Sequence, residues 1–285
     1  MRISYNMPAL ILHQIQNKAL ERQSGNLLRI SSGLKLNSAK DNPSGMVQSQ
    51  NMKLQIGGLQ AAARNVQDGV SMLQTAEGGL QEITSMIQRI RDLTMQAGNG
   101  TTTPEDRGVI QNEIDQMLDG ISSTADQTEF NGLKLLAQNG KDKVLNMPTG
   151  ANAGESTGIP QIDLTNSGQS DIPDLYSIRS DNDKNVLDGN IGDTLGAIDD
   201  TLDKVVSYRS KYGALENRFE ANYDDMQEIT DQLIGADSDL SDADVAEEIL
   251  NYSKENIITE ASNAMIAQAN KLPQDVLRVL ENVRK

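Results

Sequence analysis

The sequence predicts a mostly α-helical, elongated antiparallel bundle or coiled coil with a small β-hairpin region in the middle of the chain. Apolar residues repeat with helical periodicity at both ends, whereas the irregular stretch, residues 139–188, lies centrally. Only 3% of the 285 residues are aromatic and Trp is absent, which disfavours a thick globular core. Leu, Ile, Val, Met and Ala must therefore be buried along thin contacts between helices.

The first helix is expected to begin near Pro8, because a proline is tolerated at a helix N-terminus. Three leucines at seven-residue spacing form a heptad-like stripe: Leu20, Leu27 and Leu34. Asn42 precedes a proline and Gly45 follows soon after, so the sequence predicts a joint at residues 40–45.

A long second helix is predicted from apolar residues that step by three and four between Ile56 and Ile90, with its end near Gly98. A third helix is expected to begin at Thr103, which can cap it, before Pro104 at the first helical position. A turn at residues 130–132 and a short strand at residues 159–164 then predict one or two hairpins in the region of about 130–188.

A fourth helix is predicted over residues 191–233, followed by a break at residues 235–241. The apolar pattern of the second helix loses its heptad phase at residues 73–76, and that of the fourth does so at residues 212–215. If the chain turns back near its middle, Ala76 and Leu215 are expected at similar heights.

The fifth helix is predicted over residues 242–272, with its end at Pro273. It carries two apolar stripes, and a helix of that kind contacts more than one neighbour. One stripe contains Leu250, Ile257 and Ala264, and the other contains Ile249, Tyr252 and Ile266. We therefore expect the chain to divide into an N-terminal arm (1–44), an outer helical domain (45–240) and a C-terminal arm (241–285).

The charge distribution favours pairing of the two arms and disfavours polyanionic partners. The chain carries a net charge of −16, so nucleic acid is an unfavourable partner. Residues 1–40 carry +5 and residues 241–285 carry −3, so the arms have opposite signs. The N-terminus shows no secretory signal, and no apolar run is long enough to insert into a membrane.

No pattern of catalytic or metal-binding residues stands out, so we expect no enzyme activity, cofactor or metal. The single histidine, His13, and the absence of Cys preclude a zinc site built from His and Cys ligands. Residues 181–189 loosely resemble a calcium loop, but Val186 occupies the place of the required turn glycine. An acidic, solvated loop is the favoured interpretation of that segment.

Several segments resemble bacterial flagellins, in order and at both ends of the chain. They are "LLRISSGLKLNSAKDNPSGM" (27–46), "GLQAAARNVQDGVSMLQTAEGGLQEI" (58–83), "QRIRDLTMQAGNGT" (88–101), "TEFNGLKLL" (128–136) and "DADVAEEILNYSKENIITEASNAMIAQANKLPQDVL" (242–277). The resemblance implies that the termini pair in an inner coiled-coil domain and that many copies stack into the flagellar filament used for motility. It also implies export by the flagellum's own type III apparatus to the cell exterior.

The resemblance further implies partners and recognition residues. The expected partners are further copies of the chain, an export chaperone on the C-terminal arm, the filament cap and the hook-associated proteins. A host Toll-like receptor that senses flagellins is expected to contact Arg89, Leu93 and Glu113, by match to "QRIRDL" and "IQNEI".

Three alternatives remain open from the sequence alone. A hook–filament junction protein shares the N-terminal pattern, but "ANKLPQDVL" (269–277) resembles flagellin instead. An enzyme of the kind made by flagellins with a catalytic insert would need a longer middle region. A coiled-coil adaptor without a flagellar role is the third. For a chain that polymerises, the isolated arms are expected to be marginally stable or disordered until neighbours cover their second apolar stripe.

Overall fold

A computed structural model describes residues 6–137, 144–166, 170–180, 182, 185–187 and 191–283 of the chain. The helices are α1 (Met7–Ser32), α2 (Pro43–Ala97), α3 (Pro104–Gln127), α4 (Pro173–Tyr176), α5 (Ile191–Ser241) and α6 (Val245–Val283). The strands are β1 (Glu129–Phe130), β2 (Leu133–Lys134), β3 (Val144–Pro148) and β4 (Ser156–Pro160). The predicted fold class, helical with small hairpins in the middle, is confirmed.

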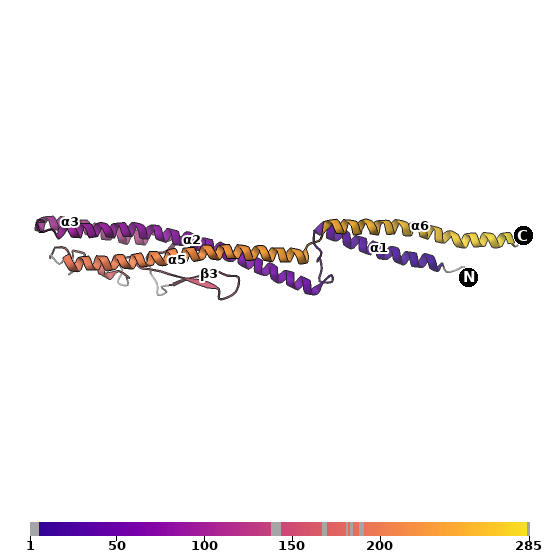
Figure 1. The fold of residues 1–285 in the computed structure, drawn as a ribbon, viewed down its shortest axis with the longest axis horizontal. Coiled ribbons are helices and arrows are strands. Elements are labelled where there is room, and N and C mark those ends of the chain that lie inside the picture. Colours follow the sequence, from indigo (N-terminus) through magenta and orange to yellow (C-terminus); the bar gives the residue numbers. More distant parts are fainter. Residues whose placement is uncertain are drawn as a thin grey trace. The chain divides into compact units, whose positions relative to one another are not determined.

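The chain forms two compact units. The terminal unit comprises Met1–Ile56 and Asp231–Lys285, and the central unit comprises Gly57–Thr230. In the terminal unit α1 and α6, which lie at opposite ends of the sequence, pack side by side (Figure 1). We call α1 and α6 the arm pair.

The central unit is held by an apolar core between α2, α3 and α5. The stripe predicted for α2 is fully buried at Leu80, Ile83, Ile87 and Ile90. It packs in one cluster with apolar residues of the other two helices: Ile114, Leu118 and Ile121 from α3, and Ile198, Val205 and Phe219 from α5.

The two positions at which α2 and α5 lose their heptad phase lie at similar heights along the helix bundle, as predicted. Gln74 Nε2 donates to Glu216 Oε1 at 2.7 Å, and Arg209 Nη2 lies 3.4 Å from Glu77 Oε1. These contacts flank Ala76 and place it at the height of the 212–215 segment. The capping box at the start of α3 is also present, because Thr103 and Asp106 bond reciprocally.

Two antiparallel strand pairs form the β region. In the first, Glu129 pairs with Lys134 and Phe130 with Leu133 across a turn at Asn131 and Gly132. Both turn residues have positive φ, 51° and 77°, which matches the predicted turn chemistry. In the second pair, β3 and β4 align from Val144↔Pro160 to Pro148↔Ser156.

The predicted strand at residues 159–164 is wrong beyond Pro160, where β4 ends. Ile162 and Leu164 are completely buried without joining a ladder, so their apolar character reflects core packing. Most of the calcium-like segment, including Asp181, Asp183 and residues 188–189, lies outside the described residues.

Two predicted helix ends are also wrong. The predicted break at residues 235–241 is helical, because α5 continues to Ser241. Gly235 alone costs a helix only about 1 kcal/mol relative to alanine. Tertiary contacts of this turn favour the helix, since Asp237 and Ser241 are buried and Lys53 Nζ lies 3.7 Å from Asp237 Oδ2.

The second wrong end is at Pro273, through which α6 continues to Val283. A proline inside a helix leaves the carbonyl four residues earlier without its intrahelical donor. Here that carbonyl belongs to Ala269, and Asn6 Nδ2 donates to it at 3.0 Å. A side chain from the other arm thus replaces the missing hydrogen bond.

Candidate functional site

The inner face of the arm pair is built from small and polar side chains. Four residues of α6 at seven-residue spacing are buried against α1: Glu248, Glu255, Ser262 and Ala269. On α1 the buried residues are Ala9 and Ala19. Small residues at heptad positions let two helix backbones approach closely. We call this inner face the seam.

Ion pairs and amide hydrogen bonds run along the seam. Arg29 Nη1 lies 3.2 Å from Glu248 Oε1, and Arg22 Nε lies 3.4 Å from Glu255 Oε1. Further along are two amide pairs, Gln23 with Asn256 at 3.4 Å and Gln16 with Asn263 at 2.6 Å.

The two glutamates of the seam are not fully satisfied. Their side chains are only 12% and 8% exposed, for Glu248 and Glu255 respectively. In each, Oε2 is buried without a hydrogen-bond partner among the described residues. Burying a charged group with incomplete pairing is unfavourable, so this seam contributes little to the stability of the arm pair by itself.

Most of the large apolar side chains of the arms point away from the seam. Leu20 and Leu27 are 44% and 54% exposed, and Leu250 and Ile257 are 71% and 66% exposed. The same holds for Leu10, Ile11, Ile15, Leu28, Val245, Met265 and Leu272. Exposed apolar residues gathered on one pair of helices indicate an interaction surface.

The sequence-predicted arm residues therefore fall into two groups. Tyr252 and Ile266 are half-buried, as is Leu34 in the connector after α1. Ile249, 48% exposed, faces outward with Leu250 and Ile257, and Ala264 is also exposed. Sequence reasoning missed the buried row Glu248, Glu255, Ser262 and Ala269. Its seven-residue spacing was the available signal, but a search for apolar heptads passes over it.

A second feature of the terminal unit is a clasp between two connectors. The segment after α1 pairs with the segment after α5 through a Leu34↔Asp242 bridge. Lys35 N donates to Ser241 O at 2.7 Å, and Ala243 N donates to Gly33 O at 2.9 Å. Gly33 adopts φ of 71°, the left-handed conformation that ends α1.

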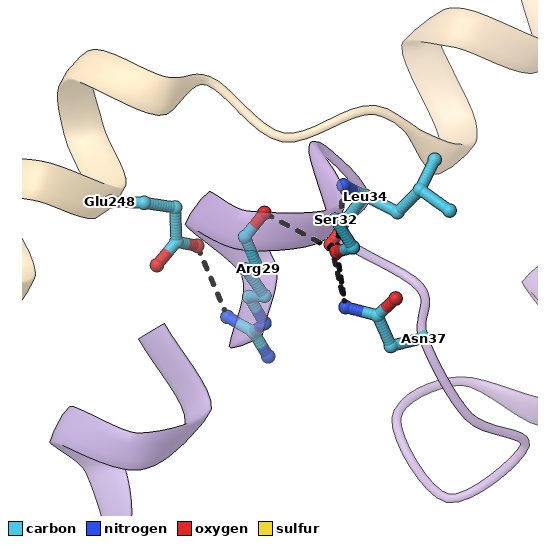
Figure 2. Close-up of polar contacts among 5 residues, drawn as sticks. All are labelled: Arg29, Ser32, Leu34, Asn37 and Glu248. Carbon is cyan, nitrogen blue, oxygen red and sulfur yellow. Dashed lines mark hydrogen bonds and ion pairs between the residues drawn. The ribbon is translucent and has the colours of Figure 1, made fainter. Parts of the chain in front are cut away.

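Ser32 makes hydrogen bonds that hold the connector after α1 in its place in the clasp, as Figure 2 shows. Its Oγ accepts hydrogen bonds from Leu34 N at 3.2 Å and from Asn37 Nδ2 at 2.8 Å. Ser32 Oγ also lies 3.3 Å from Arg29 O, to which it can donate. The Arg29 side chain meanwhile reaches Glu248, so the clasp adjoins the first ion pair of the seam.

In the central unit the structure brings two of the three predicted receptor residues together. Arg89 Nη2 and Glu113 Oε1 form an ion pair at 2.9 Å, with side chains 54% and 41% exposed. Leu93 is only 2% exposed and packs in the apolar core. The pair therefore presents charge at the surface, whereas the Leu93 side chain is buried.

Two tyrosines of the central unit have perturbed titration. Burial raises the pKa of Tyr176 to about 12, and its hydroxyl donates to Leu164 O at 2.7 Å. Burial also raises the pKa of Tyr212, whose hydroxyl donates to Pro160 O at 2.8 Å. The two hydroxyls donate to backbone carbonyls at the end of β4 and just after it, which is a structural role.

Two further findings concern the described part of the chain only. It contains no group of three or more His, Cys, Asp or Glu residues placed to hold a metal ion. Among its helices, none combines the length and apolar content that crossing a bilayer requires.

Comparison with known proteins gives a consistent result. Residues 3–141 match the bacterial flagellin N-terminal helical region, and residues 195–280 match the bacterial flagellin C-terminal helical region. The chain is 36% identical to a flagellin from Halalkalibacterium halodurans over 282 residues, covering 98% of this chain and all of that protein. A flagellin from Bacillus subtilis is also 36% identical, over 304 residues, with the same coverage.

A solved flagellar hook-associated protein from Vibrio parahaemolyticus shares the fold, with a TM-score of 0.57 over 71% of this chain and all of that one. Its identity is 16%, so the likeness concerns the fold alone and does not favour a junction protein. The full-length match to flagellins and the two matching terminal regions decide the family. The chain belongs to the bacterial flagellins, and it is a structural subunit of the flagellar filament.

Proposed function

We propose that the arm pair is the polymerising element of this subunit, and that neighbouring copies cover its outward apolar face. The main supporting observation is that the arms reverse the usual pattern of a coiled coil. Polar and small residues lie in the seam between the helices, and most of the large apolar residues lie outside it. Burial of apolar surface contributes about 25 cal/mol per Å². Most of that gain is available only when another copy supplies the opposing surface.

Coupling of arm stability to assembly follows from the same arrangement. A helix pair with a polar seam is marginal alone, whereas in a polymer its outer face is buried too. The proposal therefore divides the chain by role into polymerising arms, residues 1–44 and 241–285, and an outer domain, residues 45–240. A head-to-tail interface that repeats without closing produces a helical filament.

The same proposal extends to export and to other partners. Weakly paired arms suit passage through a narrow type III export channel and secretion to the outside of the cell. The exposed residues of α6, such as Leu250 and Ile257, offer an apolar strip for an export chaperone. The filament cap and the hook-associated proteins would contact the same arms at the filament ends. No enzymatic step is assigned to the chain.

Deletion of either arm tests the assembly proposal. Chains lacking residues 1–40 or 246–285 should retain a folded helical central unit by circular dichroism and should not elongate filament seeds. The matched point variant is Leu250→Ser with Ile257→Ser, which leaves the seam intact and should also fail to elongate seeds. Normal elongation by any of these chains would overturn the proposal.

A second proposed function is recognition by the host receptor that senses flagellins. The supporting observation is the exposed Arg89–Glu113 pair, joined at 2.9 Å. Arginine in a well-supported surface position is a frequent hot spot of protein interfaces. Arg89→Ala should lower signalling potency in a reporter-cell assay with monomeric protein.

The matched control is Arg91→Ala. Arg91 is also an exposed arginine of α2 in an ion pair at 2.9 Å, in its case with Asp199 of α5. Full potency of Arg89→Ala, with an unchanged circular dichroism spectrum, would rule out the assignment.

A further inference from the structure

The polar residues of the seam repeat at seven-residue spacing on both helices, whereas Ala9 and Ala19 do not. On α1 the polar residues repeat as Arg22 and Arg29, and as Gln16 and Gln23. On α6 the partners repeat at the same interval: Glu248 and Glu255, and Asn256, Asn263 and Asn270. A heptad repeat places all members of such a series on one face of a helix.

A slide of α1 along α6 by one heptad, about 10 Å, would therefore recreate most of the polar contacts of the seam in kind. The new pairs would be Arg29 with Glu255, Gln23 with Asn263 and Gln16 with Asn270. Two charged residues would lose their partners, because Arg22 would meet Ser262 and Glu248 would lie beyond the end of α1. Arg22, 58% exposed at its side chain, can turn to solvent, so the seam favours the observed register through the one ion pair of Glu248.

The connector after α1, residues 33–42, is not at full extension. Asp41 N donates to Ser38 O at 3.0 Å, so part of the connector is folded into a turn that a slide could straighten.

Contacts at the two ends of the arm pair have no copy seven residues away. At one end the clasp joins Gly33 and Lys35 to Ser241 and Ala243 through backbone hydrogen bonds shaped by Ser32. A displacement of about 10 Å breaks all of these bonds, because hydrogen bonds need donor–acceptor distances near 3 Å.

At the other end Asn6 binds α6 at a position marked by its proline. Asn6 Nδ2 donates at 3.0 Å to the Ala269 carbonyl, which Pro273 leaves without an intrahelical donor. The same amide lies 3.1 Å from Asn270 Oδ1. Since α6 contains one proline, this free carbonyl occurs once along the helix.

We propose that the clasp at Ser32 and the Asn6–Ala269 contact set the register of the two arms, and that the seam between them adds only the preference of one ion pair. The proposal rests on the proposed function, in which the arms pair within the filament. A slipped register would displace the outward leucines of α1 by about 10 Å relative to those of α6 and would misplace the apolar face that neighbours cover.

Site-specific cross-linking in filaments tests this directly, because the chain has no cysteine of its own. One reporter carries Gln23→Cys with Asn256→Cys, the observed register, and a second carries Gln23→Cys with Asn263→Cys, the slipped one. Each is copolymerised with excess unmodified chain, so that two reporters are rarely neighbours. Dibromobimane, which fluoresces strongly once it bridges two thiols, measures the intrachain cross-link.

Each reporter is combined with end variants chosen to be mild. Asn6→Asp keeps an acceptor that can cap α1 but removes the donor to Ala269 O. Ser32→Ala removes the acceptor used by Leu34 and Asn37. Gly33→Ala strains the left-handed residue of the clasp, and its added Cβ meets no atom within 4 Å, so the change acts on the backbone alone. Ser31→Ala is the matched control.

With intact ends, only the observed-register reporter should cross-link. With Asn6→Asp and Ser32→Ala together, the slipped reporter should gain roughly tenfold or more relative to the other, since each lost hydrogen bond shifts such a ratio by roughly two- to tenfold. Gly33→Ala should shift the ratio in the same direction, and Ser31→Ala should leave it unchanged.

Three outcomes would overturn the inference. An unchanged cross-linking ratio in both Gly33→Ala and the combined variant would show that the seam sets the register. Loss of both cross-links in the end variants would show that the ends are needed for pairing itself. Failure of the observed-register reporter with intact ends would instead contradict the pairing of the arms in the filament, and with it the proposed function.

Discussion

The two partners of the first seam ion pair are predicted to respond unequally to substitution. Arg29 is 36% exposed at its side chain, whereas the Glu248 side chain is 12% exposed. Arg29→Leu therefore leaves a buried carboxylate without its cation, at a cost of about 1.5 kcal/mol after allowance for partial exposure. Glu248→Leu removes a carboxylate whose Oε2 already lacks a partner, and it leaves an arginine that can turn to solvent.

The assay is the critical concentration for filament growth from seeds, because the paired arms are formed in the polymer. A loss of about 1.5 kcal/mol raises that concentration roughly tenfold for Arg29→Leu. Glu248→Leu should leave it unchanged or lower it. The double variant should resemble Glu248→Leu, since apolar replacement of a buried ion pair is often neutral or stabilising. Equal increases in the two single variants would refute the reasoning.

Three further predictions concern stability. Gln111 is 1% exposed, and its side chain donates to Ile178 O and accepts from Val186 N. Gln111→Leu should therefore lower the free energy of unfolding of the central unit, measured by urea titration, by about 2–4 kcal/mol, whereas the exposed control Gln116→Leu should leave it unchanged. Tyr176 has its pKa raised by burial, so the stability it contributes is complete below its unfolded pKa, about 10, and is lost as the pH rises through about 12; Tyr176→Phe should flatten this alkaline loss in urea titrations. Limited proteolysis of dilute monomer should trim both arms to a fragment of roughly residues 45–240, and resistant termini at low concentration would contradict the proposed weakness of the arms.

Much of the fold follows from periodicity in the sequence. The apolar stripe of α2, the cap at Thr103 and the turn at Asn131 are local signals, and each is where the sequence places it. The end of α6 could not be predicted locally. Pro273 is a helix terminator by its own chemistry, and the compensating donor, Asn6, is more than 260 residues away in the sequence.

The residues of the seam were not predicted from the sequence, for a different reason. Sequence reasoning assigns large apolar residues to the inside of a coiled coil, so the leucine stripe of α1 was expected to mark helix contacts. In this monomer Leu20 and Leu27 are exposed, and Ala19 is fully buried instead. In the proposed function these large apolar residues are buried against other copies of the chain. The fold of a single chain does not show those contacts.

The central claim is that assembly covers the outward apolar face of the arms, and thiol protection measures this most directly. Ile257→Cys introduces a single thiol at a position 66% exposed in the monomer. Its reaction with a soluble maleimide should be rapid in monomers and slower by roughly a hundredfold or more in filaments, as for a buried thiol. Equal reaction rates in monomer and filament would contradict the claim.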